Sequence, residues 1–272
     1  MTSALEELDT DLAAAAPASS AASARRREKR SARLQHAAAV RSPHAPGAGE
    51  SVQARHPAAR ADGSGLPARP GLLPQRDAMR TLARLLTPDE HWRLFPELAA
   101  AALYLDIETT GLDEDDPITV VGLSCGHAHR ARALISGRDL TRRALGRALR
   151  PARLIVTWNG AAFDLPRLRR RYPDLPWDLP HFDLALASRR LGLGGALKAV
   201  ERTLGRRRPA ALAGIDGAEA ARLWRRHECG VRGAAHVLAE YCRADVQALI
   251  ELAPLLHTRM QERFGAGQLL LP

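Results

Sequence analysis

Two acidic residues stand where a buried strand would continue, in the segment LYLDIETTGL at 103–112. Three apolar or aromatic residues run directly into Asp106, and Glu108 follows two positions later. Because alternate residues of a strand point to the same face, this spacing predicts that both carboxylates share one face. A solvated strand end would also explain them. An unpaired carboxylate is costly to bury, so we expect positive charge opposite the pair.

A third acid, Asp164, follows another strand of the buried type, predicted at 154–158. Asn159 begins the turn after that strand, and Asp164 begins the next helix, whose first turn tolerates Pro166. An N-cap role would explain Asp164, since aspartate caps helices well, but it leaves Asn159 unexplained. The turn therefore brings a further carboxylate to a second strand end.

The fourth acid, Asp245, lies in a segment whose apolar residues recur at helical spacing. Tyr241 and Asp245 are four residues apart, so they share one face of the predicted helix. A tyrosine–aspartate pair by itself is more often a structural hydrogen bond than a catalytic pair. Asp245 nevertheless lies on or beside the apolar stripe, where an unpaired charge is costly.

Taken together, the four acids indicate metal-dependent chemistry. The carboxyl ends of strands in an α/β sheet meet at one edge, where ligands bind. Four carboxylates there would repel one another unless roughly two divalent cations, about 3.5–4 Å apart, neutralised them. Oxygen ligands without His or Cys favour Mg²⁺ or Mn²⁺ over zinc. Such a pair of ions suits the attack of water on a phosphodiester, so the pattern predicts hydrolysis of nucleic acid.

The elements that must position these acids alternate between strands and helices. Three sequential strands, then a helix, a strand and further helices, predict an α/β fold with a mixed sheet. The three sequential strands are antiparallel, parallel strands follow, and helices flank the sheet. The strands are predicted near 102–107, 118–125, 131–136 and 154–158, and the first helix of the domain at about 139–149.

Composition divides the chain into four parts. Residues 1–75 are rich in alanine, arginine and proline and nearly lack large apolar side chains, so we expect a disordered tail. Residues 76–98 form a helical lead-in, in which Thr87–Glu90 matches a capping box with proline at the first helical position. The folded domain spans 99–260, and 261–272 form a C-terminal tail.

The charge balance is basic, with 40 Lys and Arg residues against 30 Asp and Glu and a formal net charge of +10. A basic chain favours an anionic partner such as nucleic acid. Only Lys29 and Lys198 are lysines, so the bias also reflects an arginine- and alanine-rich composition. The run RRREKR at 25–30 would suit nucleic acid, although a solvated tail explains it more simply.

The three cysteines are too few for a disulfide framework and suit a reducing compartment. Their spacing from neighbouring histidines matches no familiar zinc pattern. No apolar run is long enough to cross a bilayer, and acidic residues rather than a basic leader open the chain. We therefore expect a soluble, cytoplasmic protein without membrane contact. The sequence does not indicate its oligomeric state.

In this order, the residues resemble the motifs of the DEDD superfamily of 3′–5′ exonucleases, which has a ribonuclease-H-like fold. LDIETTGL resembles the first exonuclease motif, NGAAFD at 159–164 the second, and Tyr241-x-x-x-Asp245 the third. Position 240 holds glutamate rather than histidine, and tyrosine follows it, so the chain resembles the tyrosine subclass. The resemblance implies that Tyr241 orients the attacking water. It also implies that two ions are held by Asp106, Glu108, Asp164 and Asp245.

The segments between these motifs resemble the YprB-type ribonuclease-H-like domain of bacteria, over about residues 102–256. They are HFDLALASRRL at 181–191, LKAVERTLG at 197–205 and IDGAEAARLW at 215–224. The resemblance implies a hydrolase, a 3′–5′ exonuclease that acts on single-stranded DNA or RNA ends. Two alternatives stay open, a non-catalytic nucleic-acid-binding module and a structure-specific endonuclease of the same fold.

Residues beside the motifs are candidates for substrate binding. Thr109 and Thr110 could donate to a terminal nucleotide, although turn formation explains them equally well. Asn159 and Phe163 complete this set, although Phe163 would also fit in the core. Arginines at 167, 169–171 and 206–208 could line a strand-binding groove, although an exposed helix face is the simpler interpretation.

Three further expectations concern neighbouring residues. Asp183 is expected to cap a helix or to support a metal ligand, rather than to contact a metal itself. Cys242 replaces the asparagine expected after the tyrosine and should face away from the ions. The acidic run Asp113–Asp116 is expected to form a solvated turn.

Overall fold

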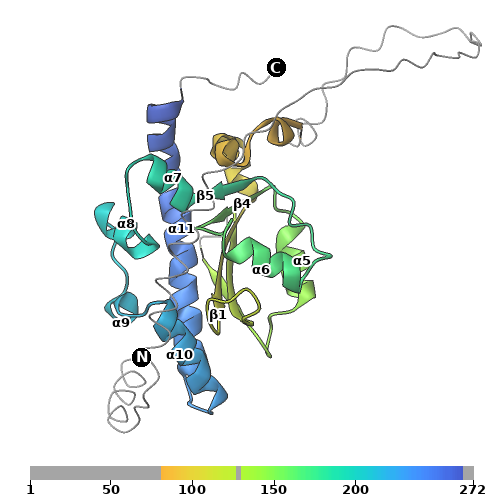
Figure 1. Ribbon diagram of the computed structural model, residues 1–272, viewed down its shortest axis with the longest axis vertical. Helices are drawn as coiled ribbons and strands as arrows, with labels where there is room; N and C mark the ends of the chain where they lie inside the picture. Colours follow the sequence, from red (N-terminus) through yellow and green to blue (C-terminus); the bar gives the residue numbers. More distant parts are fainter. Residues whose placement is uncertain (1–80, 127–129, 266–272) are drawn as a thin grey trace, which may run out of the picture. The chain divides into compact units, whose positions relative to one another are not determined.

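The computed structural model describes residues 81–126 and 130–265, which belong to one compact unit (Figure 1). The tail predicted at 1–75 and the basic run at 25–30 lie outside the described residues. The last helix continues to Phe264, past the boundary expected at residue 260.

Five strands form one mixed sheet in the order β3-β2-β1-β4-β5. The central strand β1 (Ala102–Thr109) is antiparallel to β2 (Ile118–Cys125) and parallel to β4 (Leu154–Thr157). At the edges, β3 (Arg132–Ile135) is antiparallel to β2, and β5 (His181–Asp183) is parallel to β4. The predicted α/β class is confirmed, with three sequential antiparallel strands followed by parallel ones.

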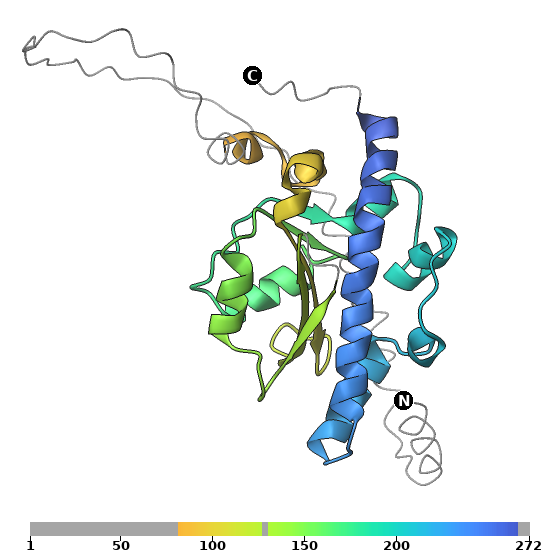
Figure 2. The same cartoon turned by 180° about the vertical axis from the view of Figure 1, so that it is seen from behind.

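Helices cover both faces of this sheet. Figure 2 shows α11 along one face, between the sheet and the segment that holds α8 and α9, while α5 and α6 lie on the opposite side. α11 is 31 residues long. The helices are α5 (Arg142–Leu149), α6 (Asp164–Arg171), α7 (Leu184–Arg190), α8 (Leu197–Thr203), α9 (Ala210–Ala213), α10 (Gly217–Glu228) and α11 (Ala234–Phe264).

The lead-in is helical, but its predicted capping box is wrong. Residues 88–94 form a 3₁₀ helix, η1 (Pro88–Leu94), and the Thr87 side chain makes no cap to the backbone. Its hydroxyl donates instead to the Glu90 carboxylate at 3.5 Å. The short helices α4 (Phe95–Leu98) and η2 (Ala99–Ala101) then lead directly into β1.

Side-chain alternation along β1 assigns its residues to two different cores. Leu103, Leu105 and Ile107 pack with α5 and α6, whereas Tyr104 packs with α11. Asp106 and Glu108 have the same parity as Tyr104, so they lie on the face that α11 covers. The predicted sharing of one face by the two carboxylates is confirmed.

A glycine in β2 allows α11 to lie close to the sheet beside these acids. Gly122 is the residue of β2 that pairs with Asp106. A Cβ at this position would lie 2.7 Å from Cγ2 of Val246 and 2.8 Å from Sγ of Cys242. Both contacts are far shorter than van der Waals separation, so any larger residue must push the helix away from the sheet.

We predict that Gly122→Ala lowers the free energy of unfolding by about 1–3 kcal/mol, the usual effect of overpacking. Urea denaturation of the full chain measures this change. Gly214→Ala is the matched control, since φ is −86° there and an added Cβ meets nothing within 4 Å. Equal stability of the two variants would contradict the close approach of α11.

Candidate active site

The four predicted acids meet in one cluster between β1, α6 and α11. Glu108, Asp164 and Asp245 are buried, at 7%, 3% and 6% exposure, and Asp106 is partly buried. Burial raises the pKa of Asp106 well above its usual value, and the charges of Asp245, Glu108 and Asp164 raise it further. Residues far apart in the sequence therefore form a single electrostatic group, which we call the acid cluster.

The same forces act on the other members of the acid cluster. Burial raises the pKa of Glu108 well above its usual value, with added repulsion from Asp245 and Asp164. Burial also raises the pKa of Asp245, against the opposing effect of Arg208. Because each charge disfavours the others, the fully ionised cluster is stable only beside compensating positive charge.

Asp164 is held in place by the backbone of β1. It is the first residue of α6, and its Oδ1 accepts a hydrogen bond from the N–H of Ile107 at 3.0 Å. That N–H lies beyond Tyr104, the last residue of β1 that pairs with β4. Burial raises the pKa of Asp164 to about 7, although the Ile107 hydrogen bond opposes the shift. The Asp164 carboxylate thus accepts the hydrogen bond of a β1 N–H group that lies past the last residue pairing with β4, and it also belongs to the acid cluster.

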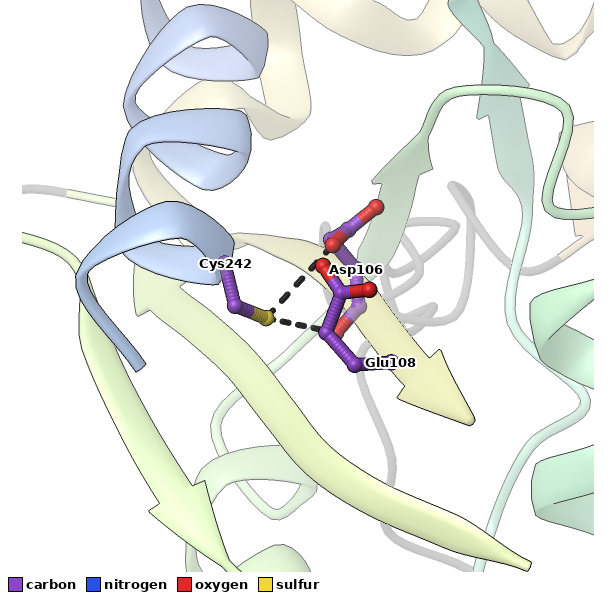
Figure 3. A group of neighbouring side chains, drawn as sticks. All are labelled: Asp106, Glu108 and Cys242. Atoms are coloured by element: carbon purple, nitrogen blue, oxygen red, sulfur yellow. Dashed lines mark hydrogen bonds between the residues drawn. The ribbon is translucent and has the colours of Figure 1, made fainter. Parts of the chain in front are cut away.

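Cys242 points into the acid cluster, so the expectation that it faces away is wrong. Its Sγ lies 3.5 Å from Oδ2 of Asp106, and ligand atoms of Asp106, Glu108 and Cys242 all lie within 4.8 Å of one another (Figure 3). Cys242 faces the sheet because Gly122 leaves room for its sulfur. Burial and the adjacent acids raise the pKa of the thiol well above its usual value, so it remains a protonated donor.

Tyr241 lies on the same face of α11 as Asp245, as the spacing predicts. Its side chain is buried, and its hydroxyl lowers the pKa of the nearby Asp245 carboxyl. Burial, followed by the charges of Asp245, Glu108 and Asp106, raises the pKa of the phenol. The amino group of Lys198 lies 4.7 Å from the centre of its ring. The phenol therefore stays protonated and can donate a hydrogen bond.

The positive charge expected opposite the acids comes from Arg208. Its Nη2 lies 2.5 Å from Oδ1 of Asp245, and its Nε lies 2.6 Å from Oε2 of Glu201. The exposed helix face expected for the arginines at 206–208 is therefore wrong for Arg208, because only 7% of its side chain is exposed. Nothing in the run RRR distinguishes this residue from Arg207, because its partners come from α8 and α11.

The threonines predicted to bind substrate take part in the turn after β1. Thr109 Oγ1 donates to the carbonyl of Gly111 at 2.5 Å, and Thr110 Oγ1 donates to Asp116 at 3.4 Å. Both hydroxyls thus have partners within the turn, as the alternative interpretation expects. Their proposed contact with a nucleotide stays a prediction.

The turn between β4 and α6 is fixed by Asp183. Asp183 caps α7, as predicted, by accepting from the N–H groups of Ala185 and Leu186. It also accepts from the N–H of Asn159, whose φ of 59° is left-handed, at 2.9 Å. Asn159 is exposed, and its role in substrate binding stays a prediction.

Arginines of α6 hold the acidic turn at Asp113–Asp116. Arg167 is buried, with its guanidinium 3.8 Å from the ring centre of the partly buried Phe163. It donates to the carbonyls of Leu112 and Asp113, so the exposed helix face expected for this residue is wrong. Arg170 pairs with both Glu114 and Asp115, so the turn is exposed but ion-paired.

A family model described as RNase_H superfamily matches residues 103–257, more than half of the chain. The chain belongs to the RNase H superfamily. The matched range contains the whole acid cluster and Tyr241. The five-stranded mixed sheet with flanking helices is the architecture expected for this superfamily.

Among solved structures, the chain is similar to the family B DNA polymerase from the hyperthermophilic archaeon Pyrobaculum calidifontis. The two are 19% identical, with a TM-score of 0.47, over 57% of this chain and 24% of the polymerase chain. The chain thus spans about a quarter of that polymerase. A search of curated proteins finds no match. Within the described ranges, no helix is long and apolar enough to cross a membrane.

We predict that replacing Asp164 by asparagine changes how stability depends on pH. The pKa of Asp164 is about 7 in the folded protein and 3.8 for a free aspartate, so the folded state binds more protons between these values. The stability that Asp164 contributes is therefore lost as pH rises through this window. Asparagine avoids this loss and can still accept from Ile107.

Urea denaturation in EDTA from pH 4 to pH 8 measures the difference between Asp164→Asn and wild type. The variant should gain about 2–4 kcal/mol relative to wild type between about pH 4 and pH 7. A difference that is constant over this range would show that Asp164 ionises normally.

Proposed function

We propose that the chain is a metal-dependent nuclease, a 3′–5′ exonuclease that hydrolyses phosphodiester bonds at single-stranded DNA or RNA ends. The observation that carries the proposal is the convergence of four carboxylates from β1, α6 and α11 in one buried cluster. Membership in the RNase H superfamily supports a nuclease. Tyr241, at the place that the tyrosine subclass requires, supports the DEDD type and the YprB-type assignment.

The residues present fit a pair of hard divalent cations, Mg²⁺ or Mn²⁺. The donors are carboxylate oxygens, which these ions prefer, and the repulsion within the acid cluster calls for added positive charge. Asp106, Glu108, Asp164 and Asp245 would hold the ions. Bound cations would activate the attacking water and stabilise the leaving oxygen.

The protein itself contributes orientation of the reacting groups. Tyr241 is a protonated donor at the edge of the cluster, so it suits the orientation of a water molecule. Its ring is fixed by burial on α11 and by the nearby Lys198. Side chains held by packing keep such a geometry within narrow limits, which favours reaction.

We predict that wild-type protein shortens end-labelled oligonucleotides in Mg²⁺ or Mn²⁺, and that Asp106→Asn loses more than about 100-fold of this rate. Loss of a direct ligand should exceed the 10–100-fold effect typical of groups that only support ligands. Gel electrophoresis of 3′- and 5′-labelled DNA and RNA measures the rate and the direction of shortening.

Asp115→Asn is the matched control, since Asp115 is an exposed acid that pairs with Arg170 outside the cluster. It should retain the wild-type rate. Cleavage of covalently closed circles would indicate the endonuclease alternative. Strand binding without any cleavage would indicate the binding-module alternative, and equal rates for wild type and Asp106→Asn would contradict the proposal.

A further inference from the structure

Arg208 brings a buried guanidinium to the acid cluster. It lies in the segment between α8 and α9, and only 7% of its side chain is exposed. Its Nε is paired with Glu201, which is itself 3% exposed. This pairing fixes one edge of the guanidinium and directs the other edge toward Asp245.

The edge that faces the cluster has one donor without an acceptor. Nη2 of Arg208 forms an ion pair with Asp245, and Nη1 is buried without a hydrogen-bond partner in the described part of the chain. A buried donor without an acceptor is unfavourable, so an acceptor that reaches this edge gains the missing bonds. Phosphate is the acceptor that best matches the planar fork of arginine.

Arg208 also competes with cations for Asp245. A cation held by the acid cluster would share the carboxylate to which Nη2 is paired. Two positive charges at one carboxylate repel each other, so occupation of the cluster weakens the hold of Asp245 on Arg208. The guanidinium stays anchored by Glu201 and is then free to bind an anion beside the cluster.

We propose that Arg208 is a displaceable counter-ion. It neutralises Asp245 while the acid cluster holds no cation, and it binds a phosphate of the nucleic-acid strand once cations are present. This inference rests on the proposed function for the identity of the anion. It assigns two successive partners, a carboxylate and a phosphate, to the same guanidinium edge.

Arg206 offers a matched control in the same segment. Its Nη2 lies 2.5 Å from Oε2 of Glu251 on α11, and its Nη1 also lacks a hydrogen-bond partner among the described residues. Glu251 is outside the acid cluster, and the Arg206 side chain is 19% exposed. Arg206→Gln therefore removes a similar ion pair without touching the proposed site.

Two measurements on the full chain test the proposal. Calorimetric titration with Mn²⁺, without nucleic acid, should show about tenfold tighter binding for Arg208→Gln, because a competing positive charge is gone. Fluorescence anisotropy with a single-stranded oligonucleotide in Ca²⁺ should show about tenfold weaker binding, the usual loss for a hydrogen bond to a charged group. Gel analysis confirms that the strand stays intact. Arg206→Gln should match wild type in Mn²⁺ binding.

The two expected changes in affinity, tighter for Mn²⁺ and weaker for the strand, distinguish this role from a structural one. Loss of affinity for both Mn²⁺ and the strand in a variant that keeps its fold would overturn the proposal. An unchanged affinity for either one would also overturn it.

Arg208→Lys keeps the proposal testable where Arg208→Gln fails to fold. Lysine retains the charge without the fork, so Mn²⁺ binding should remain near wild type while strand binding falls. Wild-type strand affinity in Arg208→Lys would contradict phosphate binding by the fork. Neither measurement requires turnover. A wild-type protein that cleaves nothing would contradict the proposed function. The role of Arg208 would still be decided by the two binding measurements.

Discussion

Repulsion among four buried carboxylates is the constraint on which the rest of this structure depends. Asp106, Glu108, Asp164 and Asp245 come from three different elements. Burial disfavours the anion of each, and neighbouring acids of the cluster further disfavour the anions of Asp106 and Glu108. Such a group weakens the fold unless positive charge offsets it. The fold tolerates this repulsion because the surrounding packing is extensive. The same repulsion is the source of the affinity for cations that we propose.

Close packing of α11 against the sheet converts this repulsion into a defined site. The helix carries Tyr241, Cys242 and Asp245, and Gly122 lets it approach β1 and β2 without a steric barrier. On the other side, Asp164 is fixed by the backbone of β1 rather than by a side chain. Positions set by a helix, a strand and a backbone hydrogen bond are more precise than positions set by loops. The positions of the site residues are therefore fixed by the sheet and the helix packed on it.

Local periodicity was sufficient to predict the fold class and the convergence of the acids, because β1 and α11 follow regular spacing. Asp106 and Glu108 share a face by the twofold repeat of a strand, and Tyr241 and Asp245 by the helical repeat. The partners of single arginines were not predictable, since Arg208 and Arg167 contact residues that are distant in the sequence. Cys242 was misplaced for a similar reason, because the space for its sulfur comes from a glycine on another element.

Anomalous scattering from crystals grown with Mn²⁺ tests the cation-binding role of the acid cluster most directly, because it locates the ions without reference to activity. The account predicts strong peaks within coordination distance, about 2.0–2.2 Å, of carboxylate oxygens from Asp106 and Asp245, with Glu108 and Asp164 completing the shell. Well-ordered crystals in saturating Mn²⁺ whose peaks lie only elsewhere would contradict it.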